Sequence, residues 1–205
     1  MSNPWEEIDL KDYESHMSLA DVYQLQGMNE MMKEQFYTYG VRSLMILGVA
    51  GGNGLEHIDK ASFQAVYGVD INQCYLEECR TRYKALEGIL HTICTDLTCG
   101  DLLLPHADLL IANLLIEYIG YECFQRVVKM VAPQYVSCII QVNTDASFVS
   151  DSPYLHVFDR LEEVHHTIGK EGLFRCMEEI GYRKGTVLER PLPNGKKLVR
   201  MDFLA

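Results

Sequence analysis

The sequence predicts a doubly wound α/β fold, because short apolar runs alternate with helical segments from residue 43 onward. The runs are apolar at successive positions, which is typical of strands buried on both faces of a parallel sheet. The first run ends in a glycine-rich turn over residues 48–54. Near the C-terminus an Asn-Gly pair separates two further strand-like runs and predicts a β-hairpin.

Five apolar runs are expected to form parallel strands. They are Leu44–Leu47, Ala65–Val69, Ile89–Cys94, Ala107–Ala112 and Tyr135–Val142. Helical segments fall between them, notably Gln73–Leu86 and Tyr121–Val131. Because strands and helices alternate in this way, we expect a mostly parallel sheet with helices on both faces.

The C-terminal part has a different pattern. A helix over Lys170–Ile180 is expected to end at Gly181. The segments Arg183–Arg190 and Lys196–Phe203 then flank a turn that contains Asn194 and Gly195. We therefore expect the sheet to finish with an antiparallel hairpin.

Residues 1–42 precede the first strand and are expected to form a helical extension or lid. One helix is predicted over residues 18–39, with Ser18 as its N-cap and Gly40 as its end. The segment Tyr13–Met17 is a candidate lid over a ligand, and simple packing of an extra helix is the alternative. We expect one domain over 1–205, whose core spans 43–205.

Composition excludes several classes of protein. The 205 residues carry a net charge of -11 and have a pI near 5.0, whereas a nucleic-acid binder is expected to be basic. No apolar run is long enough for a membrane helix, and residues 1–12 lack a signal-peptide pattern. The cysteines are odd in number, seven, and no two have CxxC spacing, so we expect reduced thiols and no metal site. A cytoplasmic protein is expected.

The glycine-rich turn is the sharpest motif. It runs from Gly48 through Ala50 and Gly52 to Gly54, directly after the first strand. Glycines there let the backbone approach a ligand closely, and a tight turn without a ligand is the alternative. His57 stands where the third glycine of the dinucleotide-binding motif should be, and no Gly-Lys-Ser/Thr follows. A nicotinamide cofactor and a bound nucleoside triphosphate are both disfavoured.

Two acidic residues follow the next two strands. Asp70 ends the second strand, where a carboxylate can accept hydrogen bonds from ribose hydroxyls. Alternatively Asp70 caps the following helix, a role that Asn72 would fill equally well. Asp96 follows the third strand and could bind an adenine amino group, with Leu97 against the ring, although a solvated turn is an equal alternative.

With these motifs, the chain resembles the class I S-adenosylmethionine (SAM)-dependent methyltransferases, in particular those that act on small molecules. The resemblance covers residues 43–142 by motif, including 108–119 as the fourth motif, and the remainder by element order. It implies a seven-stranded, Rossmann-like sheet, SAM as cofactor, S-adenosylhomocysteine (SAH) as product and a small-molecule acceptor. The implied cofactor-binding residues are Gly48, Ala50, Gly52, Asn53, Gly54, Asp70, Ile71, Asp96, Leu97 and Asn113.

The chain departs from the family pattern in the first motif. Gly48 replaces an acid that is common there, and Ala50 replaces the usual first glycine of the loop. We therefore expect Tyr13 or His16 to contribute to the site of the methionine part of SAM. The fourth motif also lacks the Asn/Asp-Pro-Pro-Tyr/Phe sequence of enzymes that methylate base amino groups.

Candidate catalytic residues follow the fourth strand or precede the last helix. Asn113, Glu117 and Tyr118 belong to the first group, and His165 and His166 to the second. Tyr118 and the two histidines are the leading candidates, because histidine titrates near neutral pH and suits proton removal. Alternatively, each histidine stabilises a surface segment.

Three functions remain in competition. The first is methyl transfer from SAM to a small molecule or a protein side chain. The second is SAM binding without catalysis, and the third, disfavoured by His57, is a nicotinamide oxidoreductase. The acceptor, the need for a general base and the oligomeric state are left open.

Overall fold

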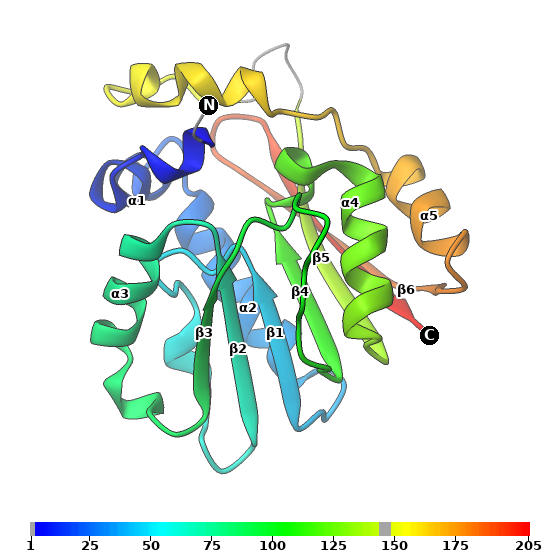
Figure 1. The fold of residues 1–205 in the computed structure, drawn as a ribbon. Helices are drawn as coiled ribbons and strands as arrows, with labels where there is room; N and C mark the ends of the chain where they lie inside the picture. The colour runs from blue at the N-terminus through cyan, green and yellow to red at the C-terminus, as the bar shows by residue number, and fades with distance from the viewer. Residues whose placement is uncertain (1–2, 144–148) are drawn as a thin grey trace.

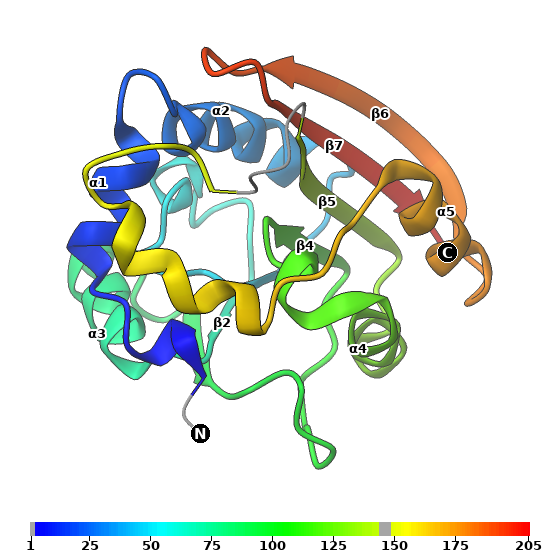
Figure 2. The same ribbon diagram turned by 90° about the horizontal axis from the view of Figure 1, so that it is seen from above.

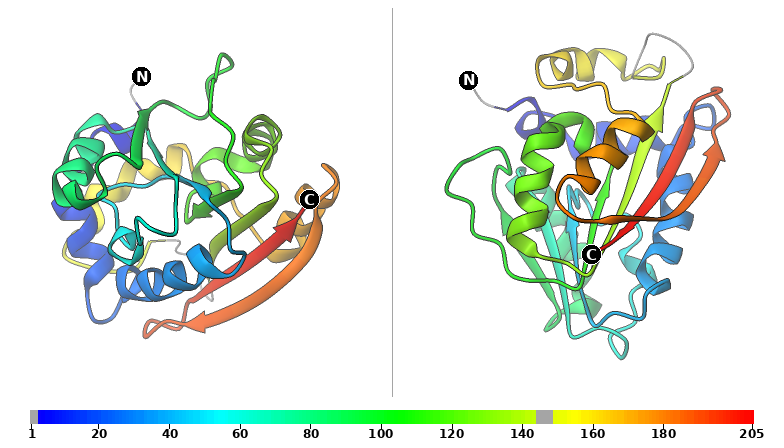
Figure 3. Two further views of the ribbon diagram at one scale, coloured as in Figure 1. Left: turned by 90° about the horizontal axis from the view of Figure 1, so that it is seen from below. Right: turned by 90° about the vertical axis from the view of Figure 1, so that its right-hand side faces the viewer.

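The chain forms three layers, a seven-stranded sheet between two layers of helices (Figure 1). The structure is a computed structural model, and it describes residues 3–143 and 149–205. Figure 3 shows the sheet from one side, with α4 and α5 against one face and α2 against the other.

The sheet has the strand order β3-β2-β1-β4-β5-β7-β6. Strands β1 to β5 are parallel, and β7 runs antiparallel between β5 and β6. The bounds are β1 Ser43–Leu47, β2 Ala65–Asp70, β3 Leu90–Cys94, β4 Leu109–Asn113, β5 Tyr135–Val142, β6 Arg183–Pro191 and β7 Lys197–Leu204. The expected fold class, including the C-terminal hairpin, is confirmed.

The helices cover the sheet and one of its edges. The α-helices are α1 Leu10–Ser18, α2 Gln24–Tyr37, α3 Gln73–Arg82, α4 Ile116–Val131 and α5 Lys170–Glu178. Short 3-10 segments span Pro4–Glu6, Leu55–His57, Lys84–Leu86 and Leu155–Glu163. Within the described ranges, no helix is long and apolar enough to cross a membrane.

The N-terminal extension contains two helices, so the single helix predicted over 18–39 was wrong. Ser18 is the last residue of α1, and Asp9 caps that helix by accepting the Lys11 N–H at 2.8 Å. The chain then turns through Tyr23, which has a positive φ of 53°, before α2 begins at Gln24. The turn lets α2 pack on the sheet while α1 stays at its edge, a tertiary requirement that local periodicity does not show.

Helix α4 begins at Ile116, earlier than the predicted Tyr121. Its first turn is separated from the rest by Gly120, whose φ of 71° and ψ of 169° are not helical. The periodicity from Tyr121 therefore corresponds to the part of the helix after this kink.

The core has two halves, one on each face of the sheet. In β1, Met45 and Leu47 pack with α4 and α5, whereas Leu44 and Ile46 pack with α2 and α3. All four are at most 2% exposed. Burial on both faces explains why the strand is apolar at every position.

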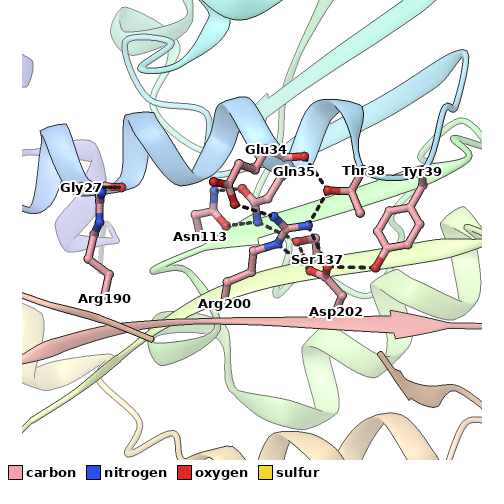
Figure 4. Close-up of polar contacts among 10 residues, drawn as sticks. All are labelled: Gly27, Glu34, Gln35, Thr38, Tyr39, Asn113, Ser137, Arg190, Arg200 and Asp202. Atoms are coloured by element: carbon pink, nitrogen blue, oxygen red, sulfur yellow. Dashed lines mark hydrogen bonds and ion pairs between the residues drawn. The ribbon is translucent and has the colours of Figure 1, made fainter. Parts of the chain in front are cut away.

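A buried polar network fixes α2 to β5 and β7 (Figure 4). Arg200, 2% exposed, donates two hydrogen bonds to Asp202, at 2.9 and 2.7 Å. Asp202 also accepts from the Ser137 hydroxyl, and Ser137 accepts from Gln35 of α2 at 2.8 Å. A further bond joins Arg200 to Thr38, at the end of α2. Because these groups are paired, the network can be buried without isolated charge.

Candidate functional site

The N-terminal segment lies over the carboxyl edge of the parallel strands (Figure 2). There it meets the 3-10 segment Leu155–Glu163, since Ile8 packs against Phe158 and Leu161. Beneath this cover is a first cavity of about 720 Å³, which includes the space at its open mouth. Ligands bind at this edge of open α/β sheets.

The loop after β1 supplies one wall of the first cavity. Gly48 and Ala50 line it, and both have positive φ, 68° and 46°. The Gly48 N–H donates to the Val69 carbonyl at 2.8 Å, and the Ala50 N–H donates to Asp70 Oδ2 at 2.9 Å. The loop is therefore held against the end of β2, although alanine is strained in this conformation.

The rest of the glycine-rich turn faces helices and does not line the first cavity. A Cβ at Gly52 would come within 2.6 Å of Tyr83, and one at Gly54 within 3.0 Å of Met32. Asn53 donates to the Leu25 carbonyl at 3.0 Å. These three residues, expected to bind cofactor, are thus required for close packing of α2 and α3 against the turn.

Asp70 lies inside the first cavity, at the end of β2. Its Oδ2 accepts from Ala50, and its Oδ1 accepts from the Asn72 N–H at 2.9 Å. Asn72 is the cap of α3, because its side chain accepts from Cys74 and Tyr75. Burial raises the pKa of Asp70 above the usual range, and these backbone hydrogen bonds oppose the rise. Lone pairs on both oxygens are left for a ligand's hydroxyl groups.

Asp96 and Leu97, which follow β3, line the first cavity, as does Ile71. Asp96 Oδ1 accepts from the backbone N–H and the hydroxyl of Thr98, at 2.8 and 2.7 Å. Leu97 is buried, 6% exposed. Asp96 therefore shapes the turn that holds Leu97 against the cavity.

Asn113 also lines the first cavity, but its side chain is turned toward α2 (Figure 4). Its amide exchanges two hydrogen bonds with Gln35, at 3.0 and 2.9 Å. The next residue, Leu114, has a φ of 52°, a strained conformation that is typical of functional sites. Leu114 lines the cavity too.

Aromatic side chains from the N-terminal segment, α3 and α4 form a further wall of the first cavity. The ring of Trp5 is 5.7 Å from that of Tyr13 and 4.9 Å from that of Tyr118, and Tyr13 stacks on Tyr75 at 6.4 Å. Trp5 Nε1 is buried and has no hydrogen-bond partner among the described residues. Sequence reasoning missed Trp5, although it is the only tryptophan in the chain.

A second cavity of about 1560 Å³, again including open space, adjoins the first. Four residues line both cavities, namely Trp5, Tyr13, Leu114 and Tyr118. His16, Glu117 and His165 line the second cavity alone. The aromatic wall therefore stands at the boundary between the two spaces.

Glu117 is the most unusual residue of the second cavity. It is 7% exposed, its Oε1 accepts from the Gln141 N–H at 3.0 Å, and its Oε2 is buried without a hydrogen-bond partner in the described chain. Burial raises the pKa of Glu117 to about 7. Leaving such an oxygen unpaired is unfavourable, which marks the residue as a functional candidate.

Of the three leading catalytic candidates, the structure brings two to the second cavity. Tyr118 lines both cavities, and burial followed by the charge of Glu117 raises its pKa. The ring of His165 lies 6.0 Å from that of Tyr118, and burial lowers the pKa of His165. His166 lines neither cavity: its N–H donates to the Glu117 carbonyl at 2.6 Å, and its ring lies against Gly120.

His16, suggested as a cofactor contact, lines the second cavity and not the first. Its Nδ1 is 2.8 Å from the Ser152 hydroxyl. Burial, with a smaller effect of Lys196, lowers the pKa of His16 to about 4, so the ring is neutral at physiological pH. All seven cysteines are free thiols, and the described residues contain no group of three or more His, Cys, Asp or Glu side chains that could hold a metal ion.

No protein-family model and no curated protein sequence matches the chain. Solved structures do match. The N-methyltransferase NodS from Bradyrhizobium japonicum WM9 with bound SAH has a TM-score of 0.67 and 12% identity, covering 95% of this chain and 97% of its own. Magnesium protoporphyrin IX methyltransferase (ChlM) from Synechocystis PCC 6803 with bound SAM has a TM-score of 0.62 and 10% identity, covering 93% and 82%.

A third match is the cyclase SpnF, with a TM-score of 0.64 and 11% identity, covering 87% of this chain and 80% of its own. Together these structures show that the chain has the fold of the class I SAM-dependent methyltransferases. The fold that the resemblance implied is thereby confirmed.

Proposed function

We propose that the chain transfers a methyl group from SAM to a small molecule. The observation that carries this proposal is the pair of adjoining cavities, because eight of the eleven expected cofactor residues line the first and Glu117 lines the second. NodS and ChlM, which share the fold, are methyltransferases solved with SAH and SAM.

The residues of the first cavity fit SAM. Asp70 offers buried carboxylate oxygens for the ribose hydroxyls, and Leu97 offers an apolar surface for the adenine. The unpartnered N–H of Trp5 requires an acceptor, which the carboxylate of the methionine part would provide. Trp5 therefore takes the role that we had expected of Tyr13 or His16, with Tyr13 packed beside it.

When bound, SAM supplies a methyl group already activated on a sulfonium, so the protein mainly positions the acceptor and excludes water. The cover formed by residues 3–18 and 155–163 closes the edge where transfer would occur. Leu114, Tyr118 and Trp5 lie between the two spaces and would set the approach of the acceptor. This covered second cavity favours a small acceptor over a protein side chain.

We propose the N-terminal segment as a lid. It is tied to the cofactor side of the sheet, because the Asn72 amide donates to the Trp5 carbonyl at 3.0 Å and the Tyr75 hydroxyl donates to the Ile8 carbonyl at 2.8 Å. Glu14 also pairs with Arg82 of α3. Deletion of residues 1–20 should weaken SAM binding, and an unchanged affinity would end the lid proposal.

A matched pair of variants tests cofactor binding. Asp70→Asn removes a charge inside the first cavity, whereas Asp108→Asn removes one at the amino end of β4, where Asp108 accepts from Ser43. SAM and SAH are titrated calorimetrically into both and into the wild type. The proposal requires loss of affinity in Asp70→Asn alone, and equal affinities in both variants would contradict it.

The fold alone does not require methyl transfer, since SpnF, a [4+2]-cyclase, shares it, and SAM binding without catalysis is the alternative. In this chain, Gly48 in place of the acid that is common in the family favours a test of that alternative. If SAM binds but no SAH forms with any acceptor in a broad metabolite screen, the alternative stands.

A further inference from the structure

We infer that Glu117 binds the ammonium group of a small amine acceptor in the second cavity and takes up its proton before methyl transfer. This inference rests on the proposed function and names the class of its acceptor. It starts from a single atom, the buried Oε2 of Glu117, which has no hydrogen-bond partner among the described residues.

The fold holds this carboxylate firmly in place. Glu117 is in the first turn of α4, and its Oε1 is fixed by the Gln141 N–H of β5. Its own carbonyl accepts the His166 N–H at 2.6 Å, which ties the turn to the segment before α5. A carboxylate held by one hydrogen bond on a turn that is itself tied down is suited to orienting a ligand, because little freedom remains to be lost on binding.

The groups around the second cavity favour a cation. Among the described residues that line it, Glu117 is the buried acid, whereas Glu171 is exposed to solvent at the rim. The lysine on the rim, Lys170, is paired with Glu189 at 2.8 Å, and the buried Lys196 acts on the His16 side of the cavity, where its charge helps to lower the pKa of His16. His16 is neutral at physiological pH because its pKa is about 4, and burial lowers the pKa of His165 as well. A bound ammonium would therefore meet negative charge without a histidine cation beside it.

Aromatic rings complete the environment of an ammonium ion. Trp5, Tyr13, Tyr118 and Phe158 line the second cavity. Their faces attract cations, and a desolvated position strengthens that attraction. A neutral hydroxyl would satisfy Oε2 with one hydrogen bond but would gain neither the charge interaction nor the contact with the rings. An anionic acceptor would be repelled.

The chemistry balances with the groups present. An ammonium nitrogen has no lone pair, so one N–H proton first moves to Glu117, giving a neutral amine and a neutral carboxylic acid. The nitrogen lone pair then forms the new C–N bond, and the electron pair of the C–S bond stays on sulfur. A group with a pKa near 7 is well placed for such a proton transfer.

Trp5 provides a direct readout, because it is the only tryptophan and lines both cavities. Its fluorescence is followed while the full chain is titrated with phenethylamine or with phenethyl alcohol, which differ in the amine. Glu117→Gln removes the charge with little change of shape. Glu171→Gln, on the exposed rim of the same cavity, is the matched control.

The wild type and Glu171→Gln should bind the amine about tenfold or more tightly than the alcohol, and this preference should fall close to one in Glu117→Gln. Equal affinities in the wild type, no amine binding at millimolar concentration, or a preference that persists in Glu117→Gln would overturn the inference. SAH is titrated separately into each protein. Failure to bind SAH would contradict the proposed function, while the amine preference still decides the role of Glu117.

Discussion

Trp5 and Tyr118 meet edge to face, with ring centroids 4.9 Å apart and an interplanar angle of 81°, at the boundary between the two cavities. They come from opposite parts of the fold, since Trp5 belongs to the N-terminal segment and Tyr118 to the first turn of α4. The contact joins the N-terminal cover to the strand edge beneath it, and both residues line the two cavities.

Trp5→Phe tests the role of the unpartnered indole N–H. The variant keeps an aromatic ring but removes the donor, so SAH should bind about five- to thirtyfold more weakly if a charged acceptor on the ligand uses that donor. Calorimetry measures the change, because the variant lacks the fluorescent residue. An unchanged affinity would show that the indole N–H does not contact the cofactor.

Glu117 should make the stability of the protein depend on pH. Its pKa rises from 4.5 to about 7 on folding, so the folded state keeps a proton that the unfolded state releases in this range. The free energy of unfolding therefore falls by about 3 kcal/mol in total as the pH rises from about 4.5 to about 7, and it levels off above this range.

Glu117→Gln removes this dependence on pH, because glutamine does not ionise. The free energy of unfolding of the variant relative to the wild type should therefore rise, by most of that fall of about 3 kcal/mol, from about pH 5 to about pH 8, and urea unfolding measures it. Glu171→Gln is the control and should follow the wild type at both values. A constant difference between Glu117→Gln and the wild type would show that Glu117 ionises normally in the folded protein.

Ala50 should tolerate a smaller residue and reject a branched one. Its φ of 46° is strained for any side chain, and a β-branched side chain is the least compatible with it. Ala50→Gly should leave the stability within about 1 kcal/mol of the wild type, because relief of strain and added freedom of the unfolded chain oppose each other. Ala50→Val should lose about 2 kcal/mol or more.

The control is Ala85→Val, at an exposed position with negative φ, which should change stability by less than about 0.5 kcal/mol. Urea unfolding compares the three variants. If Ala50→Val and Ala85→Val were equally stable, the strain assigned to the loop would be absent.

The contributions of Arg200 and Asp202 to the stability of the protein should depend on each other. Arg200→Met leaves the fully buried Asp202 without its cationic partner and should destabilise the protein by about 3–5 kcal/mol. Combining it with Asp202→Asn should recover part of this loss, because no uncompensated charge then remains. A double-mutant cycle that shows additive effects would contradict this coupling.

The strands could be predicted from sequence because burial on both faces makes them apolar at every position, as in Leu44–Leu47. The same reasoning placed Asp70 at a strand end that faces a cavity. The region before β1 was harder to predict from sequence. The position of Trp5 depends on contacts with α3, α4 and the 155–163 segment, and no local periodicity encodes them. Nor does local periodicity indicate the turn at Tyr23 that separates α1 from α2.

The residues of the glycine-rich turn show a second limit of prediction from sequence. Gly52 and Gly54 have the positive φ that the motif implies, yet their glycine character is explained by Tyr83 and Met32 packed against them. Glu117 was one of several polar residues after β4, and only the structure shows that one of its oxygens is buried without a partner.

The most direct test of the account is calorimetric titration of SAH into the wild type, Asp70→Asn and Asp108→Asn. The account predicts micromolar binding, about 8 kcal/mol, to the wild type and to Asp108→Asn, and binding at least tenfold weaker to Asp70→Asn. If the wild type binds neither SAH nor SAM, the chain has the methyltransferase fold without its cofactor, and the proposed function is wrong.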